Sequence, residues 1–178
     1  MKRRNFLLAT LLAFPAASFA RVKKLVRPNK PFRVDAGKDR SDEEFSYRGN
    51  QFFLKVSGKD TEGDLCIYDT LRIQKGGPRL HLHQSQDEWF FVIKGEFTFQ
   101  VGDKTYNLKE GDTLFGPRKI PHAFAQTSEG EGRLMLVYQP AGLMESFYKE
   151  ARAMTNPTEE QSKKLFQKHG MKLLGKPL

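Results

Sequence analysis

Three of the four histidines in the chain lie in two short stretches, one of which also carries a glutamate. His81 and His83 are two residues apart, so on a β-strand both side chains would point to the same face. Glu88 follows after a short polar turn and begins the run EWFFVI, whose aromatic and β-branched residues are typical of a strand. A hairpin at this turn would bring Glu88 across from the two histidines. The third histidine, His122, lies in the stretch GDTLFGPRKIPHAF.

These four side chains form a donor set that suits a metal ion. Three imidazoles and one carboxylate are ligands that a borderline divalent cation prefers. For His81 and His83 alone, two surface histidines beside an ordinary hairpin are an equally good interpretation, because short motifs often occur by chance. His169, the remaining histidine, falls in the last turn of a predicted helix, where an imidazolium interacts favourably with the helix dipole. We therefore assign His169 a structural or solvated role.

The order of elements around these stretches predicts one domain of 178 residues with a sizeable core. Residues 45–140 contain short strand-like runs separated by turns, which is typical of a β-sandwich or β-barrel. Residues 141–178 are predicted to be a C-terminal helical segment with two helices. The second helix begins at Thr158, with Gln161 completing a capping box. The tail MKLLGKPL is predicted to be docked by its leucines or frayed.

The first 20 residues read as a secretory signal peptide, with a basic start, an apolar run and small residues before a cleavage site after Ala20. The run RRNFL resembles a twin-arginine export signal, and a general secretory signal with two arginines is the alternative. Either route predicts export to the periplasm or cell envelope, with no stable membrane span after cleavage. Residues 21–44 are predicted to be an N-terminal extension that packs against the barrel.

The two histidine-bearing stretches resemble the two motifs of the cupin superfamily. Residues 81–95 read as H-x-H-x4-E-x6-G and residues 111–122 as G-x5-P-x4-H. Three positions depart from the usual pattern, none of them a ligand: Lys75, Lys119 and Gln126. The resemblance implies an all-β fold, a double-stranded β-helix barrel of the jelly-roll type over residues 45–140. It also implies that His81, His83, Glu88 and His122 hold one divalent metal ion inside the barrel.

The same stretches are similar to small single-domain cupins related to quercetin 2,3-dioxygenases. This similarity implies metal-dependent dioxygenation of a small phenolic or enol-type substrate, with iron, manganese, nickel, copper or zinc as the metal. Glu88 either ligates the metal or acts as a general base toward a bound hydroxyl. Because the fold hosts many reactions, two alternatives stay open: a non-redox metal isomerase, and a non-catalytic small-molecule-binding protein of the cell envelope.

Strand parity predicts which side chains share the cavity with the ligands. The predicted lining, for which plain barrel core is the alternative, consists of Phe90, Val92, Phe124 and Gln126. Trp89 and Phe91 would then point outward, and covering them predicts a homodimer. The expected partner in the cavity is a small, aromatic molecule.

The charge of the chain argues against nucleic acid as a partner. The formal net charge is +9, and removing the three basic residues of the leader from the total of 30 leaves 27 basic against 21 acidic residues, a net charge of +6. The basic residues are scattered, with no aromatic residues placed among them for base contacts, so we predict no nucleic-acid binding. A modest positive field favours anionic small molecules. The single cysteine, Cys66, excludes an intramolecular disulfide.

Overall fold

The computed structural model describes residue 27, residues 30–43 and residues 45–178. The predicted signal peptide and the first part of the predicted N-terminal extension lie outside the described residues. The helices in the described part of the chain have ten residues each, and neither could span a membrane.

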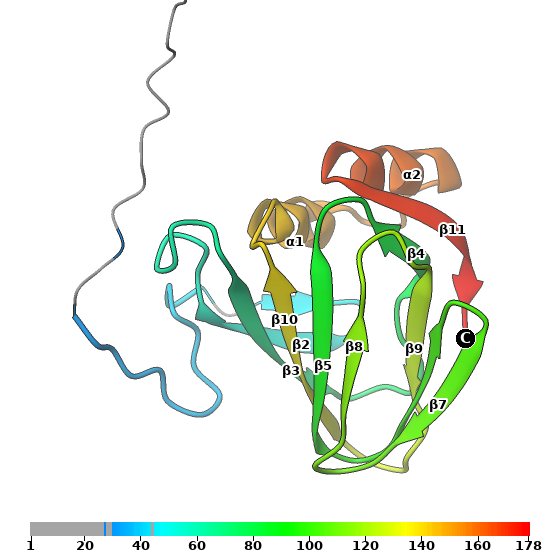
Figure 1. Cartoon of the computed structure of the whole chain (residues 1–178), viewed down its shortest axis with the longest axis horizontal. Helices are drawn as coiled ribbons and strands as arrows, with labels where there is room; N and C mark the ends of the chain where they lie inside the picture. The colour runs from blue at the N-terminus through cyan, green and yellow to red at the C-terminus, as the bar shows by residue number, and fades with distance from the viewer. Residues whose placement is uncertain (1–26, 28–29, 44) are drawn as a thin grey trace, which may run out of the picture.

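Two antiparallel sheets face each other and form a barrel (Figure 1). In spatial order, the larger sheet contains β1 (Phe45–Tyr47), β2 (Asn50–Val56), β3 (Cys66–Arg72), β10 (Gly132–Gln139), β5 (Asp87–Lys94) and β8 (Thr113–Gly116). The smaller sheet contains β11 (Met171–Pro177), β4 (Arg79–His83), β9 (His122–Gln126), β6 (Phe97–Val101) and β7 (Lys104–Leu108). The predicted all-β barrel is confirmed.

Alternation along the strands determines what faces the space between the sheets. In β5, Phe90 and Val92 are buried, whereas Trp89 and Phe91 are about half exposed. The inward and outward faces therefore follow the predicted parity. Trp89 packs edge-on against Phe115 of the neighbouring β8, with ring centroids 5.3 Å apart. The homodimer that would cover this outer face stays a prediction.

Two helices follow the barrel strands, as predicted: α1 (Met144–Ala153) and α2 (Glu159–Lys168). The apolar face of α1 is buried, including Phe147 and Tyr148. α2 begins at Thr158, whose side chain accepts a hydrogen bond from the backbone N–H of Gln161, and the predicted capping box is present. Figure 1 shows both helices at one end of the barrel, with α2 beside β11.

The end of the chain corrects one part of the prediction, because residues 171–177 form a strand instead of continuing a helical segment. β11 pairs with β4 in antiparallel register, with Met171 opposite His83 and Leu173 opposite His81. Met171 and Leu173 are buried, whereas Leu174 is exposed, so the tail has the two-residue alternation of an edge strand. The backbone of β4 is therefore paired on both sides, by β9 and β11.

Two adjacent leucines test this placement of the tail. Leu173→Ala should lower the free energy of unfolding by about 2–3 kcal/mol, because it removes buried methyl groups and leaves a cavity. Leu174→Ala is the matched control and should change it by less than about 0.5 kcal/mol, since that side chain is exposed. Urea unfolding followed by circular dichroism measures both values. Equal, small effects would show that the tail does not pack as described.

Candidate metal centre

The four residues of the predicted donor set come together between the two sheets. His81 and His83 lie on β4 and His122 on β9, where His81 and His122 are directly paired across the strands. Glu88 reaches them from β5 of the facing sheet. All four residues are buried, and one donor atom from each lies within 4.8 Å of the others. The separation is short enough for a single ion to contact all four.

An oxygen atom fixes the orientation of each imidazole ring. The Nδ1 contacts are His81 with the carbonyl of Arg79 at 2.7 Å, His122 with the carbonyl of Ile120 at 3.1 Å, and His83 with Oε1 of Gln86 at 3.2 Å. An oxygen acceptor at Nδ1 requires the proton to sit on that nitrogen, so each Nε2 is left for the cluster. Metal-binding histidines are commonly oriented in this way.

Gln86 belongs to the site although sequence reasoning did not single it out. Its side chain is buried, and its Nε2 donates hydrogen bonds to the carbonyls of Pro140 and Ala141 at 3.0 and 2.8 Å. These bonds require Oε1 to face His83. In the sequence, Gln86 looks the same as Gln84 of the same polar turn, whose side chain is exposed. Only the tertiary structure separates the two.

Charges within the cluster are strongly coupled. Oε2 of Glu88 lies 3.0 Å from Nε2 of His122 and 3.3 Å from Nε2 of His83. Burial would raise the pKa of Glu88, but the contacts from His122 and His83 outweigh it and lower that pKa below its ordinary value. Burial would lower the pKa of His122, but the hydrogen bond to Glu88 and its charge raise it. Burial and the two neighbouring histidines lower the pKa of His81 to about 3.

The cluster is suited to a divalent cation. His122 already donates its Nδ1 proton to a carbonyl, so its contact with the Glu88 carboxylate requires a second proton and a positive charge. His83 Nε2 is buried and makes no hydrogen bond of good geometry among the described residues. A metal ion would supply the positive charge beside Glu88 and accept the lone pair of His83. Three imidazoles and a carboxylate provide the donor types that first-row divalent ions bind.

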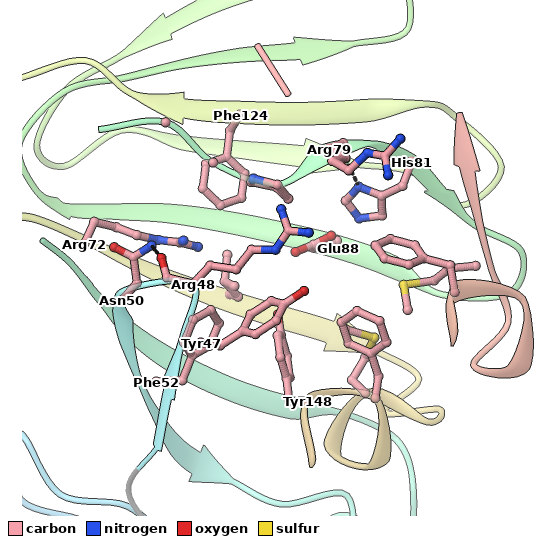
Figure 2. A pocket seen from close by; sticks show the side chains of 18 of the residues that line it. Tyr47, Arg48, Asn50, Phe52, Arg72, Arg79, His81, Glu88, Phe124 and Tyr148 are labelled. Carbon is pink, nitrogen blue, oxygen red and sulfur yellow. Dashed lines mark hydrogen bonds between the residues drawn. The ribbon is translucent and has the colours of Figure 1, made fainter. Parts of the chain in front are cut away.

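A cavity of about 210 Å³ opens beside the cluster, and His81 and Glu88 form part of its wall. Figure 2 shows Glu88 at the centre of this wall, with aromatic and basic side chains around it. Tyr138 lies opposite Glu88 on β10, and its hydroxyl is 2.8 Å from that of Tyr148. Burial and the charge of Glu88 raise the pKa of Tyr138 well above its ordinary value, so the phenol keeps its proton.

The predicted cavity lining requires a correction, because Phe124 contributes to the wall whereas Phe90, Val92 and Gln126 do not. These three face inward as expected, and each is almost fully buried. Phe90 packs at an angle against the rings of Phe99 and Phe124, at centroid distances of 4.9 and 5.8 Å. Strand parity predicts which face of the sheet a side chain lies on. It does not predict how far the cavity extends before side chains from the opposite sheet fill the space between the sheets.

Several cavity residues were not predicted from the sequence, and they come from six separate elements and the turn between β1 and β2. They are Tyr47, Arg48, Asn50, Phe52, Arg72, Tyr138, Tyr148 and Phe166. Parity along β10 could have indicated Tyr138, since Leu134 and Leu136 are buried on the same face. For the others, the sequence gives no sign that the strand, turn or helix carrying them lies beside the histidines.

The fold and the buried cluster together define a class: small antiparallel β-barrels with a candidate metal site between their sheets. Residues 70–138 match the family described as Cupin domain, and the matched segment carries all four residues of the cluster. The predicted resemblance to the cupin superfamily is therefore confirmed over residues 70–138.

Comparisons with individual proteins are more distant. A nucleoside dehydratase with a β-barrel structure covers 83% of this chain and 93% of its own, with a TM-score of 0.51 and 10% identity. KdgF from a Halomonas species aligns over 55% of this chain and 86% of its own, with a TM-score of 0.47 and 20% identity. At 10% identity, the similarity to the nucleoside dehydratase concerns the fold alone.

One curated protein also matches a short part of the chain. The uncharacterized protein MJ1618 of Methanocaldococcus jannaschii is 30% identical over 43 residues. The match covers 24% of this chain and 34% of that protein, so this chain spans about a third of the length of that relative.

Metal binding can be tested with two buried histidines, one inside the cluster and one outside it. A divalent ion at about 100 times its Kd should stabilise the protein by about 2.7 kcal/mol. His83→Ala should abolish this increment, because it removes a ligand. His169→Ala should retain the increment, since His169 bonds the Leu165 carbonyl at the end of α2. Unfolding with and without metal, together with elemental analysis, measures the effect, and equal loss in both variants would contradict the assignment.

The orienting role of Gln86 gives a second test. Gln86→Met keeps the side-chain length but removes the acceptor for His83 Nδ1, so metal affinity should fall by about 10–100-fold. Gln84→Met is the control in the same turn and should leave the affinity unchanged. Competition with a metal-binding dye provides the affinities. Unchanged affinity in Gln86→Met would mean that the ring of His83 is held by packing alone.

Proposed function

We propose that the protein is a metal-dependent enzyme acting on a small organic molecule that enters the cavity beside His81 and Glu88. The observation that carries this proposal is that a buried set of four donors, with all three rings oriented, places two of its members, His81 and Glu88, in the wall of that cavity. A purely structural ion would be expected to be enclosed by its ligands, whereas a catalytic ion needs a position facing the substrate.

The metal when bound would supply Lewis acidity toward an oxygen atom of the substrate, or toward dioxygen when the ion is redox-active. The rest of the chemistry belongs to the side chains. Glu88 is a carboxylate at the cavity wall and is positioned to accept a proton from a substrate hydroxyl. The linked hydroxyls of Tyr138 and Tyr148 can donate a hydrogen bond to the substrate or to Glu88.

Among metal-dependent reactions, we place dioxygenation of a phenolic or enol-type substrate first. The aromatic walls of the cavity support it, since Phe52, Phe124 and Phe166 present rings that can pack against a flat substrate. They also limit the access of water to the reacting atoms. This reaction consumes dioxygen as co-substrate and needs iron, manganese, nickel or copper.

A non-redox reaction, such as isomerisation of a keto acid, is the second candidate. The cavity is more polar than strand parity predicted, because Asn50, Arg72 and three tyrosines contribute to its wall. Such groups can hold the oxygen atoms of a polar substrate, and zinc would serve as the metal. Tight binding of a small molecule without turnover would instead identify a binding protein.

Export to the periplasm or cell envelope is part of the proposal. Its support is the sequence of residues 1–20, with Arg3 and Arg4 before an apolar run. Fusing these residues to a reporter that is active only after export tests this part, with Arg3→Lys and Arg4→Lys together as the variant specific for the twin-arginine route.

The reaction class can be tested by reconstituting the metal-free protein with single metals. Iron, manganese, nickel or copper should give dioxygen uptake in proportion to a phenolic or enol substrate, and zinc should give none. His122→Ala should lower turnover by about 1000-fold or more, since loss of a metal contribution of several kcal/mol corresponds to that factor. His169→Ala should retain turnover. Activity that persists with zinc and without dioxygen would favour the non-redox candidate.

A further inference from the structure

Arg72 is a buried cation with no carboxylate partner among the described residues. Its side chain is only 5% exposed, and none of the ion pairs or hydrogen bonds of the described part of the chain involves its guanidinium. Its Nε is buried and has no hydrogen-bond partner. Burying an arginine in this state is costly, because the charge loses its hydration without gaining a carboxylate in hydrogen-bond contact.

Other arginines of the described chain show how the fold usually treats this side chain. Arg79, Arg118 and Arg133 each place two nitrogen atoms on one carboxylate, from Glu159, Asp87 and Asp69 respectively. Asp69 lies on the same strand as Arg72 but pairs with Arg133. The fold therefore provides a carboxylate partner for each of these three more exposed arginines. Arg72, the most buried of the four, has none among the described residues.

The surroundings of Arg72 hold the guanidinium in the wall of the cavity. Its Cζ lies 4.8 Å from the ring centroid of Phe124 and 5.3 Å from that of Phe52. These rings stabilise the cation through cation–π contacts but supply no acceptor for its N–H groups. Figure 2 shows the side chain extending from the edge of the cavity toward its interior.

A second guanidinium reaches the same cavity from the turn between β1 and β2. Arg48 is exposed and makes no ion pair within the described residues, and Figure 2 shows its side chain extending across the cavity toward Glu88. Against these two unpaired cations, Glu88 is the single carboxylate in the cavity wall. The cavity therefore favours an anionic ligand, and more so when a divalent metal offsets Glu88.

We infer that the natural ligand of the cavity is a small monocarboxylate whose carboxylate pairs with Arg72 while an oxygen atom at its other end faces the metal cluster. This inference rests on the proposed function, because it names the substrate class of the same site. Arg72 lies over Phe124, which is two residues, or about 7 Å, along β9 from His122. A ligand about the length of a substituted benzene ring spans that distance.

Carboxylate fits this position better than phosphate. A planar guanidinium pairs with a planar carboxylate through two parallel hydrogen bonds. A phosphate monoester brings nearly two negative charges, and Arg72 offers only one positive charge among apolar rings. Removing the second charge from water would be costly. The cavity of about 210 Å³ also limits the ligand to a small molecule.

The inference can be tested by binding, using pairs of probes that differ only in charge. The pairs are 4-hydroxybenzoate with 4-hydroxybenzamide, and phenylpyruvate with its amide, each titrated calorimetrically into the metal-loaded protein. The carboxylate of at least one pair should bind at least about 10-fold more tightly than its amide. Arg72→Met should weaken carboxylate binding by about 10–100-fold, as expected for loss of a charge-assisted hydrogen bond, and should leave amide binding unchanged.

Two further variants separate charge from fold. Lys104→Met removes one positive charge from the exposed strand β7, away from the cavity. This variant should not alter the preference for the carboxylate over its amide. Arg72→Lys should recover part of the carboxylate preference, since the charge returns without the two-pronged geometry. Arg72→Met should fold with unchanged or higher stability. Equal affinity for carboxylate and amide in both pairs of wild-type titrations, or tighter binding of phenyl phosphate, would overturn the inference.

The two proposals fail in different ways. Arg72-dependent carboxylate binding without any metal-dependent turnover would support the ligand class and remove the enzymatic function. Metal-dependent turnover of neutral substrates, unaffected by Arg72→Met, would keep the function and refute the ligand class.

Discussion

The structure depends on keeping the carboxylate of Glu88 charged while it is buried. Removing a carboxylate from water is costly unless opposite charge or hydrogen bonds compensate. Here the compensation comes from Nε2 of His122, 3.0 Å away, and from His83. His122 can serve because its ring carries a proton on each nitrogen, with Nδ1 donating to the Ile120 carbonyl and Nε2 donating to Glu88. The carboxylate comes from one sheet and the imidazoles from the other, so the barrel must close correctly for the cluster to form.

This dependence explains the positions of the elements around the site. β4 carries two of the histidines, and β9 and β11 pair with it on both sides, which fixes the position of its backbone and the face toward which both side chains point. The loop after β10 supplies the carbonyls of Pro140 and Ala141 that orient Gln86, which in turn orients His83. The positions of the donor atoms are therefore determined by backbone pairing and backbone carbonyls, which vary little in direction compared with long side chains.

Local rules brought His81, His83 and Glu88 together in the prediction, whereas the resemblance to the cupin superfamily added His122 and the closed barrel. Two-residue spacing places His81 and His83 on one face, and a short turn brings Glu88 beside them. The remaining parts depend on which elements meet in space. Arg72 is the last residue of β3, a strand that carries none of the histidines. Gln86 differs from Gln84 only in the buried groups that its side chain contacts in the folded protein. Predicting the strand at residues 171–177 would have required knowing that one edge of β4 is available for pairing. No local sequence pattern contains that information.

The cavity joins two electrostatic situations that complement each other. At one end, a buried anion is surrounded by imidazoles and favours a cation. At the other, Arg72 is buried between aromatic rings and favours an anion. A ligand with a carboxylate at one end and a neutral or ionisable oxygen at the other would have only one orientation that satisfies both ends. Orientation of this kind brings the same substrate atom to the same catalytic groups at every encounter, which lowers the entropic part of the barrier. The distribution of charge in the cavity is therefore the link between the fold and any reaction carried out beside Glu88.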